Sequence, residues 1–183
     1  MSGEDRTPTA GPGELTLRHG GPGDADWLLG LFDEAIVWMV ARGQPGQWGT
    51  EPLSCSERGR ARVAEMCGGG GLRVAALAGA DVGALVVGER PQHVPAVDRP
   101  ELYIELLLVS RRHAHRRIGE RLVDAALAEA RERRAELVRV DCWAGAPTLV
   151  AWYEARGFER SATFTVNGDW HGQIFARELG RGR

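Results

Sequence analysis

The first part of the chain alternates short apolar patterns with glycine-rich breaks. Residues 14–18 alternate apolar and polar side chains, as in a strand with one buried face, and the stretch 20–23 interrupts them. A helix is predicted from Asp24, whose carboxylate suits an N-cap, to near Gly43. Its apolar stripe recurs close to every 3.6 residues and consists of Trp27, Leu28, Leu31, Ala35, Trp38 and Met39. A shorter helix is predicted over 56–66.

The remainder of the chain predicts one mixed sheet. Strands at 72–78 and 82–87 flank a turn at 79–81, which is the pattern of a hairpin. The apolar run 102–109 predicts a central strand buried on both faces. The other expected elements are a helix at 117–134, a strand at 137–142, a helix at 147–155 that opens with Pro147, and strands at 162–166 and 173–178. This order, with a βαβ unit over 102–142, indicates a single α/β domain with a mixed central sheet flanked by helices.

Length and charge limit the classes of protein to which the chain can belong. The 183 residues fit one domain, expected at 14–179, between a disordered tail at 1–13 and a short tail at 180–183. A net charge of −2 argues against nucleic acid as a partner, and no apolar run is long enough to cross a membrane. The three scattered cysteines suit neither a disulfide framework nor a metal site, so we expect a cytoplasmic protein without a metal.

The junction between the strand 102–109 and the following helix is the richest in candidate chemistry. Free N–H groups at a helix N-terminus favour phosphate, and Gly119 lets a phosphate approach the backbone. Four arginines, at 111, 112, 116 and 117, add cationic donors. The other reading of these residues is a solvated basic loop in which Gly119 only packs closely on the sheet.

Two segments resemble the GNAT superfamily of N-acetyltransferases. The sequence VSRRHAHRRIGERL at 109–122 is similar to the family's acyl-CoA signature, and AWYEARGF at 151–158 is similar to its second motif, Tyr-Glu-Lys-x-Gly-Phe. The resemblance covers about 14–179 and implies acetyl-CoA as co-substrate. It implies that CoA contacts Leu107, Leu108, Val109, Arg112, His115, Arg116, Arg117, Ile118, Gly119 and Glu120.

The chain departs from the family pattern at three positions. Ala114 replaces the first Arg or Gln of the signature, Arg117 replaces its first glycine, and Ala146 stands where the family often has an Asn that touches CoA. A non-glycine residue fits at 117 if its φ is negative, as at the start of a helix. Arg117 could then supply charge in place of backbone contacts, or it could crowd the pyrophosphate.

Two side chains are candidates for the proton transfers. Glu105 is the only charge in an apolar strand, and burial of an unpaired carboxylate raises its pKa towards the range of a base for an amine. Its alternative role is an ion pair with Arg73 or Arg139. The resemblance implies that Tyr153 lies beside the thioester sulfur and protonates the leaving thiolate; otherwise its ring packs under the turn at Gly157.

The acceptor is the least determined part of this interpretation. Acidic and aromatic residues flank the acceptor side in similar proteins, and together they suit a cation; here they include Glu34, Trp38, Trp48 and Trp170. We therefore expect the acceptor to be a small-molecule primary amine that attacks acetyl-CoA directly. The sequence is also compatible with a homodimer. The alternatives are a GNAT-fold CoA sensor without turnover and a nucleic-acid module that uses the arginines of 111–117.

Overall fold

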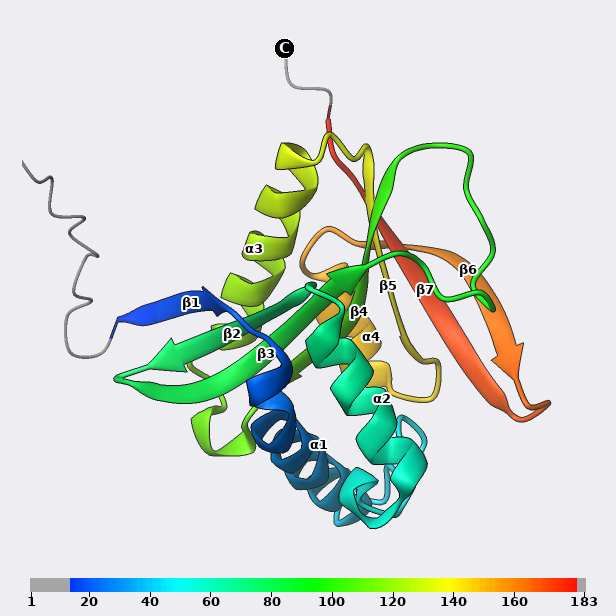
Figure 1. The fold of residues 1–183 in the computed structure, drawn as a ribbon. Helices are drawn as coiled ribbons and strands as arrows, with labels where there is room; N and C mark the ends of the chain where they lie inside the picture. Colours follow the sequence, from blue (N-terminus) through cyan, green and yellow to red (C-terminus); the bar gives the residue numbers. More distant parts are fainter. Residues whose placement is uncertain (1–13, 181–183) are drawn as a thin grey trace, which may run out of the picture.

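The computed structural model describes residues 14–180, in which seven strands form one mixed sheet (Figure 1). The spatial order of the strands is β1-β2-β3-β4-β5-β7-β6, and only β4 and β5 run parallel. The strands are β1 (Leu15–His19), β2 (Leu72–Leu77), β3 (Ala80–Gly88), β4 (Glu101–Val109), β5 (Leu137–Trp143), β6 (Glu159–Val166) and β7 (Trp170–Glu178). The mixed sheet and its central βαβ unit are as predicted.

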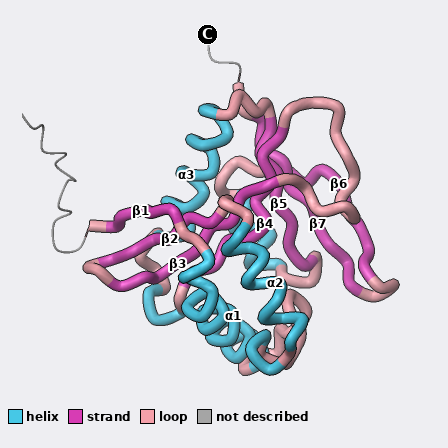
Figure 2. Tube along the Cα trace, viewed as in Figure 1, coloured by secondary structure: helices cyan, strands magenta, loops and turns pink. Residues whose placement is uncertain are grey.

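Four α-helices cover the two faces of the sheet (Figure 2). They are α1 (Ala25–Val40), α2 (Glu57–Gly68), α3 (Ile118–Glu132) and α4 (Pro147–Glu154). Helices α1 and α2 pack on one face through a core that includes Leu28, Phe32 and Val63. Helices α3 and α4 pack on the other face, where Leu122 and Tyr153 belong to the larger core. The loop between β3 and β4 covers the β5–β7 half of the first face, with Val94 against Ile174.

The two central strands pair along only half of their length. Pairing of β4 with β5 runs from Glu101 opposite Leu137 to Ile104 opposite Val140 and goes no further. On its other edge, β4 continues to pair with β3 up to Val109. The last five residues of β4 therefore have no strand beside them on the β5 side.

A β-bulge at Glu105 accompanies the divergence. Val87 pairs with Ile104 and Val86 pairs with Leu106, so Glu105 has no partner on β3. The extra residue reverses the alternation of the strand: Leu102 and Ile104 face the core under α3, whereas Leu106 and Leu108 face the core under α1. The expectation of a strand buried on both faces is wrong at this residue, because the bulge leaves Glu105 exposed.

Local chemistry at two other points differs from expectation. Asp24 occupies the N-cap position of α1 but makes no capping bond to that helix. Its carboxylate instead accepts from the backbone N–H of Gly21 and pairs with Arg18 at 2.6 Å. The first hairpin turns at Ala78 and Gly79, both with positive φ, rather than at 79–81. A two-residue turn of this kind matches the twist of the flanking strands, so β3 begins earlier than predicted.

Two further predictions concern the ends of the chain and membranes. The tail predicted at 1–13 and the last three residues lie outside the described residues. Within 14–180, no helix is long and apolar enough to cross a membrane.

Candidate active site

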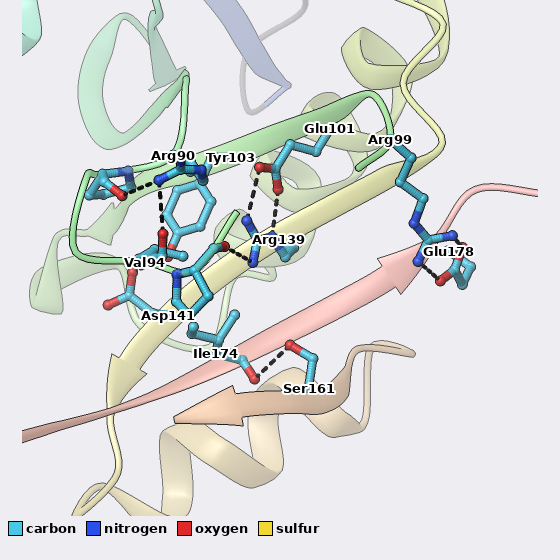
Figure 3. Close-up of polar contacts among 12 residues, drawn as sticks. Arg90, Val94, Arg99, Glu101, Tyr103, Arg139, Asp141, Ser161, Ile174 and Glu178 are labelled. Carbon is cyan, nitrogen blue, oxygen red and sulfur yellow. Dashed lines mark hydrogen bonds and ion pairs between the residues drawn. The ribbon is translucent and has the colours of Figure 1, made fainter. Parts of the chain in front are cut away.

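A ladder of polar side chains joins the paired halves of β4 and β5 (Figure 3). Arg139 on β5 forms a two-point ion pair with Glu101 on β4, with Nε to Oε2 at 2.5 Å and Nη2 to Oε1 at 2.9 Å. One step further, the buried Tyr103 hydroxyl donates to Asp141 Oδ1. These contacts hold the strands together up to the point where they diverge. The alternative that Arg139 neutralises Glu105 is therefore wrong.

The carboxylate of Glu105 lies over Gly88 of β3, at the start of the divergence. A Cβ at Gly88 would overlap its Oε1 atom, so a larger residue there would displace the carboxylate. Arg73, the other arginine considered as a partner, pairs with Glu129 at 2.8 Å. Within 14–180 no hydrogen bond or ion pair engages Glu105. Partial desolvation raises its pKa above the usual value, and Glu65 raises it further, while Arg62 opposes both.

Tyr153 lies on α4, in the core on the face of the sheet opposite α1 and α2, together with Val140 and Cys142 of β5 and Phe175 of β7. Its side chain is 4 % exposed, and its ring contacts Phe158 and Phe175 with centroids 5.8 and 5.3 Å away. Burial raises the pKa of the phenol, and the nearby Cys142 and Asp141 add to this rise. The phenol is therefore neutral at physiological pH. The ring of Tyr153 is packed in the core, as the packing alternative predicts, and its hydroxyl has no bonded partner among the described residues; its role as a proton donor stays a prediction.

The loop between β4 and α3 presents a row of backbone donors. In the described part of the chain, none of the N–H groups of residues 115–120 has a hydrogen-bond acceptor. His115 and Arg117 both have positive φ, at 64° and 57°. Successive N–H groups in such a conformation form an anion-binding concavity at the N-terminus of α3.

The left-handed conformation of Arg117 differs from the expectation of a negative φ. Arg117 occupies the position where the resembled signature has a glycine, and it adopts the backbone that glycine accommodates best. For a residue with a Cβ this conformation costs about 1–2 kcal/mol. The loop thus keeps the glycine geometry without the glycine.

Charged and aromatic groups surround this row of N–H groups. Glu120 accepts from Arg117 Nε at 2.6 Å and from Arg156 Nη2 at 2.7 Å. The guanidinium of Arg156 stacks 3.7 Å above the ring of Trp152. A Cβ at Gly119 would lie 3.1 Å from that same ring. Gly119 therefore packs closely against Trp152 of α4.

The residues predicted to contact CoA differ in what they can offer. Arg112, His115, Arg116 and Arg117 project into solvent, and the side chains of Arg112 and Arg117 are 84 % and 81 % exposed. Leu108 and Ile118 are buried in the cores, and Leu107 and Val109 are half-buried. These four can offer only backbone groups, and the Val109 carbonyl already accepts from Arg111 Nη2 at 3.1 Å.

Comparison with known proteins identifies the family. Residues 35–158, well over half of the chain, match the model of the acetyltransferase (GNAT) family. The chain belongs to the GNAT family of acetyltransferases. No match was found among curated protein sequences.

Solved GNAT-like structures share the fold at low sequence identity. A GNAT-family acetyltransferase from Listeria monocytogenes superposes with a TM-score of 0.70 at 21% identity, covering 94% of this chain and 99% of that one. Ribosomal-protein-alanine N-acetyltransferase from Brucella melitensis gives 0.63 at 22% identity, covering 90% and 99%. The protein yncA from Salmonella typhimurium, solved with its cofactor acetyl-CoA, gives 0.63 at 15% identity, covering 92% and 95%.

The residues predicted for the acceptor of this GNAT protein are engaged by its own chain. Glu34 accepts from Ser110 Oγ at 3.0 Å and from the Arg111 N–H at 2.6 Å, which ties α1 to the end of β4. The ring of Trp38 has the guanidinium groups of Arg42 and Arg111 at 4.4 and 4.7 Å. The predicted cation site on Trp38 is thus filled by arginine.

The other two predicted acceptor residues lie around the loop that follows α1. Trp48 packs edge-on against Phe32 at 5.0 Å, and Trp170 Nε1 donates to the Gly46 carbonyl at 2.6 Å. Gln47 Oε1 accepts from the backbone N–H of Trp143 at 2.7 Å, at the end of β5. The structure therefore brings Trp48 and Trp170 to one loop but does not join them to Glu34 or Trp38.

Sequence analysis did not single out Asp141. It is the only acidic residue in the apolar strand 137–142, which also carries Arg139, and this isolated carboxylate was the available signal. Burial raises the pKa of the Asp141 carboxyl, against the opposing effects of the Tyr103 hydrogen bond, His93 and Arg62. Asp141 is the first residue of β5 beyond the pairing with β4.

Proposed function

We propose that this GNAT protein transfers an acetyl group from acetyl-CoA to the primary amine of a small molecule, by direct attack within a ternary complex. The observation that carries this proposal is the divergence of β4 and β5, with an unpaired carboxylate at Glu105 on one side and the neutral phenol of Tyr153 on the other. Two findings support acetyl-CoA as the donor: the chain belongs to the GNAT family, and the structure of the similar protein yncA contains acetyl-CoA.

Acetyl-CoA would be held along β4 and at the start of α3. The unpartnered edge of β4 after Glu105 suits the amide groups of the pantetheine arm, which can pair with it as an added strand. The N–H groups of residues 115–120 suit the pyrophosphate, and Arg112, Arg116 and Arg117 supply positive charge.

The protein's own groups would then manage two protons. Glu105 accepts a proton from the amine, directly or through water, because its pKa is raised and its carboxylate is exposed to the solvent from which the acceptor arrives. Tyr153 donates its phenolic proton to the thiolate that leaves. Direct attack needs no covalent intermediate on the protein, so positioning supplies the rest of the rate enhancement.

The small-molecule acceptor is favoured by the contacts of the loop after α1. Gln47 and Gly46 bind this loop to the end of β5 and to Trp170 on β7. A protein tail would need room between these segments, whereas a small amine would not require the two contacts to break.

A CoA-binding sensor without turnover is the second candidate. One observation favours it: at the position of the first signature glycine, Arg117 carries a Cβ in a left-handed conformation and pairs with Glu120, so bulk and negative charge lie beside the phosphate site.

The acetyltransferase and the sensor can be distinguished by measuring the release of free CoA thiol from acetyl-CoA with a panel of small amines and of peptides. Turnover with small amines supports the proposal. Turnover with peptides alone contradicts the small-molecule acceptor. An upward shift of the unfolding temperature by acetyl-CoA without turnover supports the sensor.

A further inference from the structure

Asp141 lies at the point where the two central strands part. Val140 is the last residue of β5 that pairs with β4, and Glu105, directly after its partner Ile104, is the bulged residue. Asp141 pairs with Ile174 of β7 on its other side and is half-buried. The backbone of Asp141 is therefore held in the sheet by β7, and the residue is only partly covered.

The Tyr103 hydroxyl fixes the orientation of this carboxyl group. Tyr103 is fully buried and donates to Asp141 Oδ1, and Figure 3 shows the two side chains side by side between β4 and β5. No hydrogen bond is made to Oδ2 among the described residues. One oxygen is thus held by the protein while the other is left for a further donor.

Charged groups on two neighbouring segments affect the ionisation of Asp141. His93 in the loop before β4 and Arg62 on α2 favour its ionised form. Arg62 acts on Glu105 as well, which places both carboxyl groups within range of one guanidinium. Across the divergence, Asp141 also acts on the phenol of Tyr153. Asp141 therefore lies within electrostatic range of Tyr153 and shares the neighbouring Arg62 with Glu105.

Locking the strands does not require a carboxylate at this position. The ion pair between Glu101 and Arg139 already joins β4 to β5 one step earlier, with both side chains largely buried. A tyrosine hydroxyl can donate equally well to a neutral acceptor such as an amide oxygen. Within residues 14–180 the Asp141 carboxylate forms no ion pair, so the strand contacts do not account for its charge.

We propose that Asp141 is the acceptor-binding carboxylate of this enzyme: it holds the substrate amine as an ammonium ion, and Tyr103 positions it. This inference rests on the proposed acetyl transfer and names the acceptor class, a small primary amine that arrives protonated. Asp141 binds the ammonium ion, and Glu105 removes one proton from it. The neutral nitrogen then attacks the thioester carbon, the C–N bond forms and the C–S bond breaks. The thiolate takes the proton of Tyr153, which regains one from the acylated nitrogen, and Glu105 returns its proton to water.

The test uses the full-length protein and the best substrate among benzylamine, ethanolamine, putrescine and glycinamide. Asp141→Asn keeps the size of the side chain and an oxygen for Tyr103, but it removes the charge. We expect the KM for the amine to rise about 10–100-fold, as for loss of a hydrogen bond to a charged group. The KM for acetyl-CoA should change less than about twofold. Asp26→Asn, on the exposed first turn of α1, is the matched control and should change neither value.

Tyr103→Phe separates positioning from charge, because it keeps the carboxylate. The hydrogen bond from Tyr103 lowers the pKa of Asp141, so its loss should raise that pKa. An ionised Asp141 is needed to bind the amine, and the KM for the amine rises as pH falls through this pKa. In Tyr103→Phe that rise should begin at a higher pH.

The results that would overturn the inference can be told apart from failure of the proposed function. An unchanged amine KM in Asp141→Asn, or an equal rise in both KM values, would mean that Asp141 only satisfies Tyr103 or maintains the fold. A pH dependence that does not move in Tyr103→Phe would remove the positioning role. Lack of turnover by the wild type with every amine would refute the proposed function itself, and the inference with it.

Discussion

Replacing Tyr153 by Phe removes one hydroxyl group and leaves the packing of α4 intact. The aromatic ring contacts Trp152, Phe158 and Phe175 with centroids 5.1–5.8 Å away, and all of these contacts are kept in the variant. The hydroxyl donates to no group among residues 14–180, so no partner is left unsatisfied. We therefore expect the free energy of unfolding to stay within about 1.5 kcal/mol of wild type.

The effect on catalysis should be much larger than the effect on stability. Burial keeps the phenol of Tyr153 protonated, so it can donate to the thiolate at neutral pH. A CoA thiol with an ordinary pKa near 8.5 can leave unprotonated at some cost, so the acid helps without being indispensable. Loss of one such proton donor should lower kcat by about 10–1000-fold, which corresponds to about 1.4–4 kcal/mol of barrier.

Steady-state kinetics and thermal unfolding of the same preparations would test this. The KM for acetyl-CoA should barely change, because the lost interaction grows only as charge develops on sulfur. Phe175→Leu is the matched control: it disturbs the same ring cluster without removing a proton donor, so stability should fall while kcat stays near wild type. Tyr153→Ala should cost about 3–5 kcal/mol of stability. Wild-type kcat from Tyr153→Phe, with an established acceptor, would refute the acid role and leave packing as the function of Tyr153.

Three further predictions concern the base and the CoA loop. Glu105→Gln should lower kcat/KM by about 100–1000-fold; because its pKa is raised and the base must be ionised, wild-type activity should fall as pH drops through that pKa, and a pH–rate profile of the variant should lack this limb. Gly88→Ala should push the Glu105 carboxylate aside and reduce kcat/KM in the same assay, with no loss of acetyl-CoA binding; full activity would show that the position of the carboxylate is unimportant. Acetyl-CoA at 100 times its Kd should stabilise the folded protein by about 2.7 kcal/mol, and this should raise the unfolding temperature. The double variant Arg116→Ala plus Arg117→Ala should show a smaller rise. The control double variant Arg58→Ala plus Arg131→Ala, at exposed positions away from the loop, should show the same rise as wild type. An equal shift in both double variants would show that the loop arginines are only surface charge.

Several elements were predictable because their signals are local. The apolar periodicity of α1 and the apolar run of β4 predict these elements, since such patterns depend only on near neighbours. Leu28, Leu31 and Ala35 of the predicted stripe are buried, but Phe32 and Ile36 are buried as well, in place of Trp38 and Met39. Pro147 opens α4 as predicted, and Gly157 takes the positive φ that ends it. The two family motifs also lie within single junctions, one from β4 to α3 and the other from α4 to β6, so family and fold could be recognised from short segments.

The arrangement of the candidate site was not predictable in the same way. The length over which β4 and β5 pair, the bulge at Glu105 and the contact of Tyr103 with Asp141 all depend on residues that are distant in sequence. A one-residue bulge reverses the alternation of a strand, and nothing in the strand's own composition marks it.

The same reason explains the loop and the acceptor residues. The left-handed backbone of His115 and Arg117 belongs to the connection between β4 and α3, whose course depends on where these two elements are packed. The rings and carboxylates expected to receive a cation could be listed from the sequence, but only packing decided that arginines of the same chain lie on Trp38. By itself, the sequence determined the elements, the family and the types of side chain available. The tertiary structure decided which of these side chains meet, because contacts between distant segments depend on strand register and helix packing that no local pattern encodes.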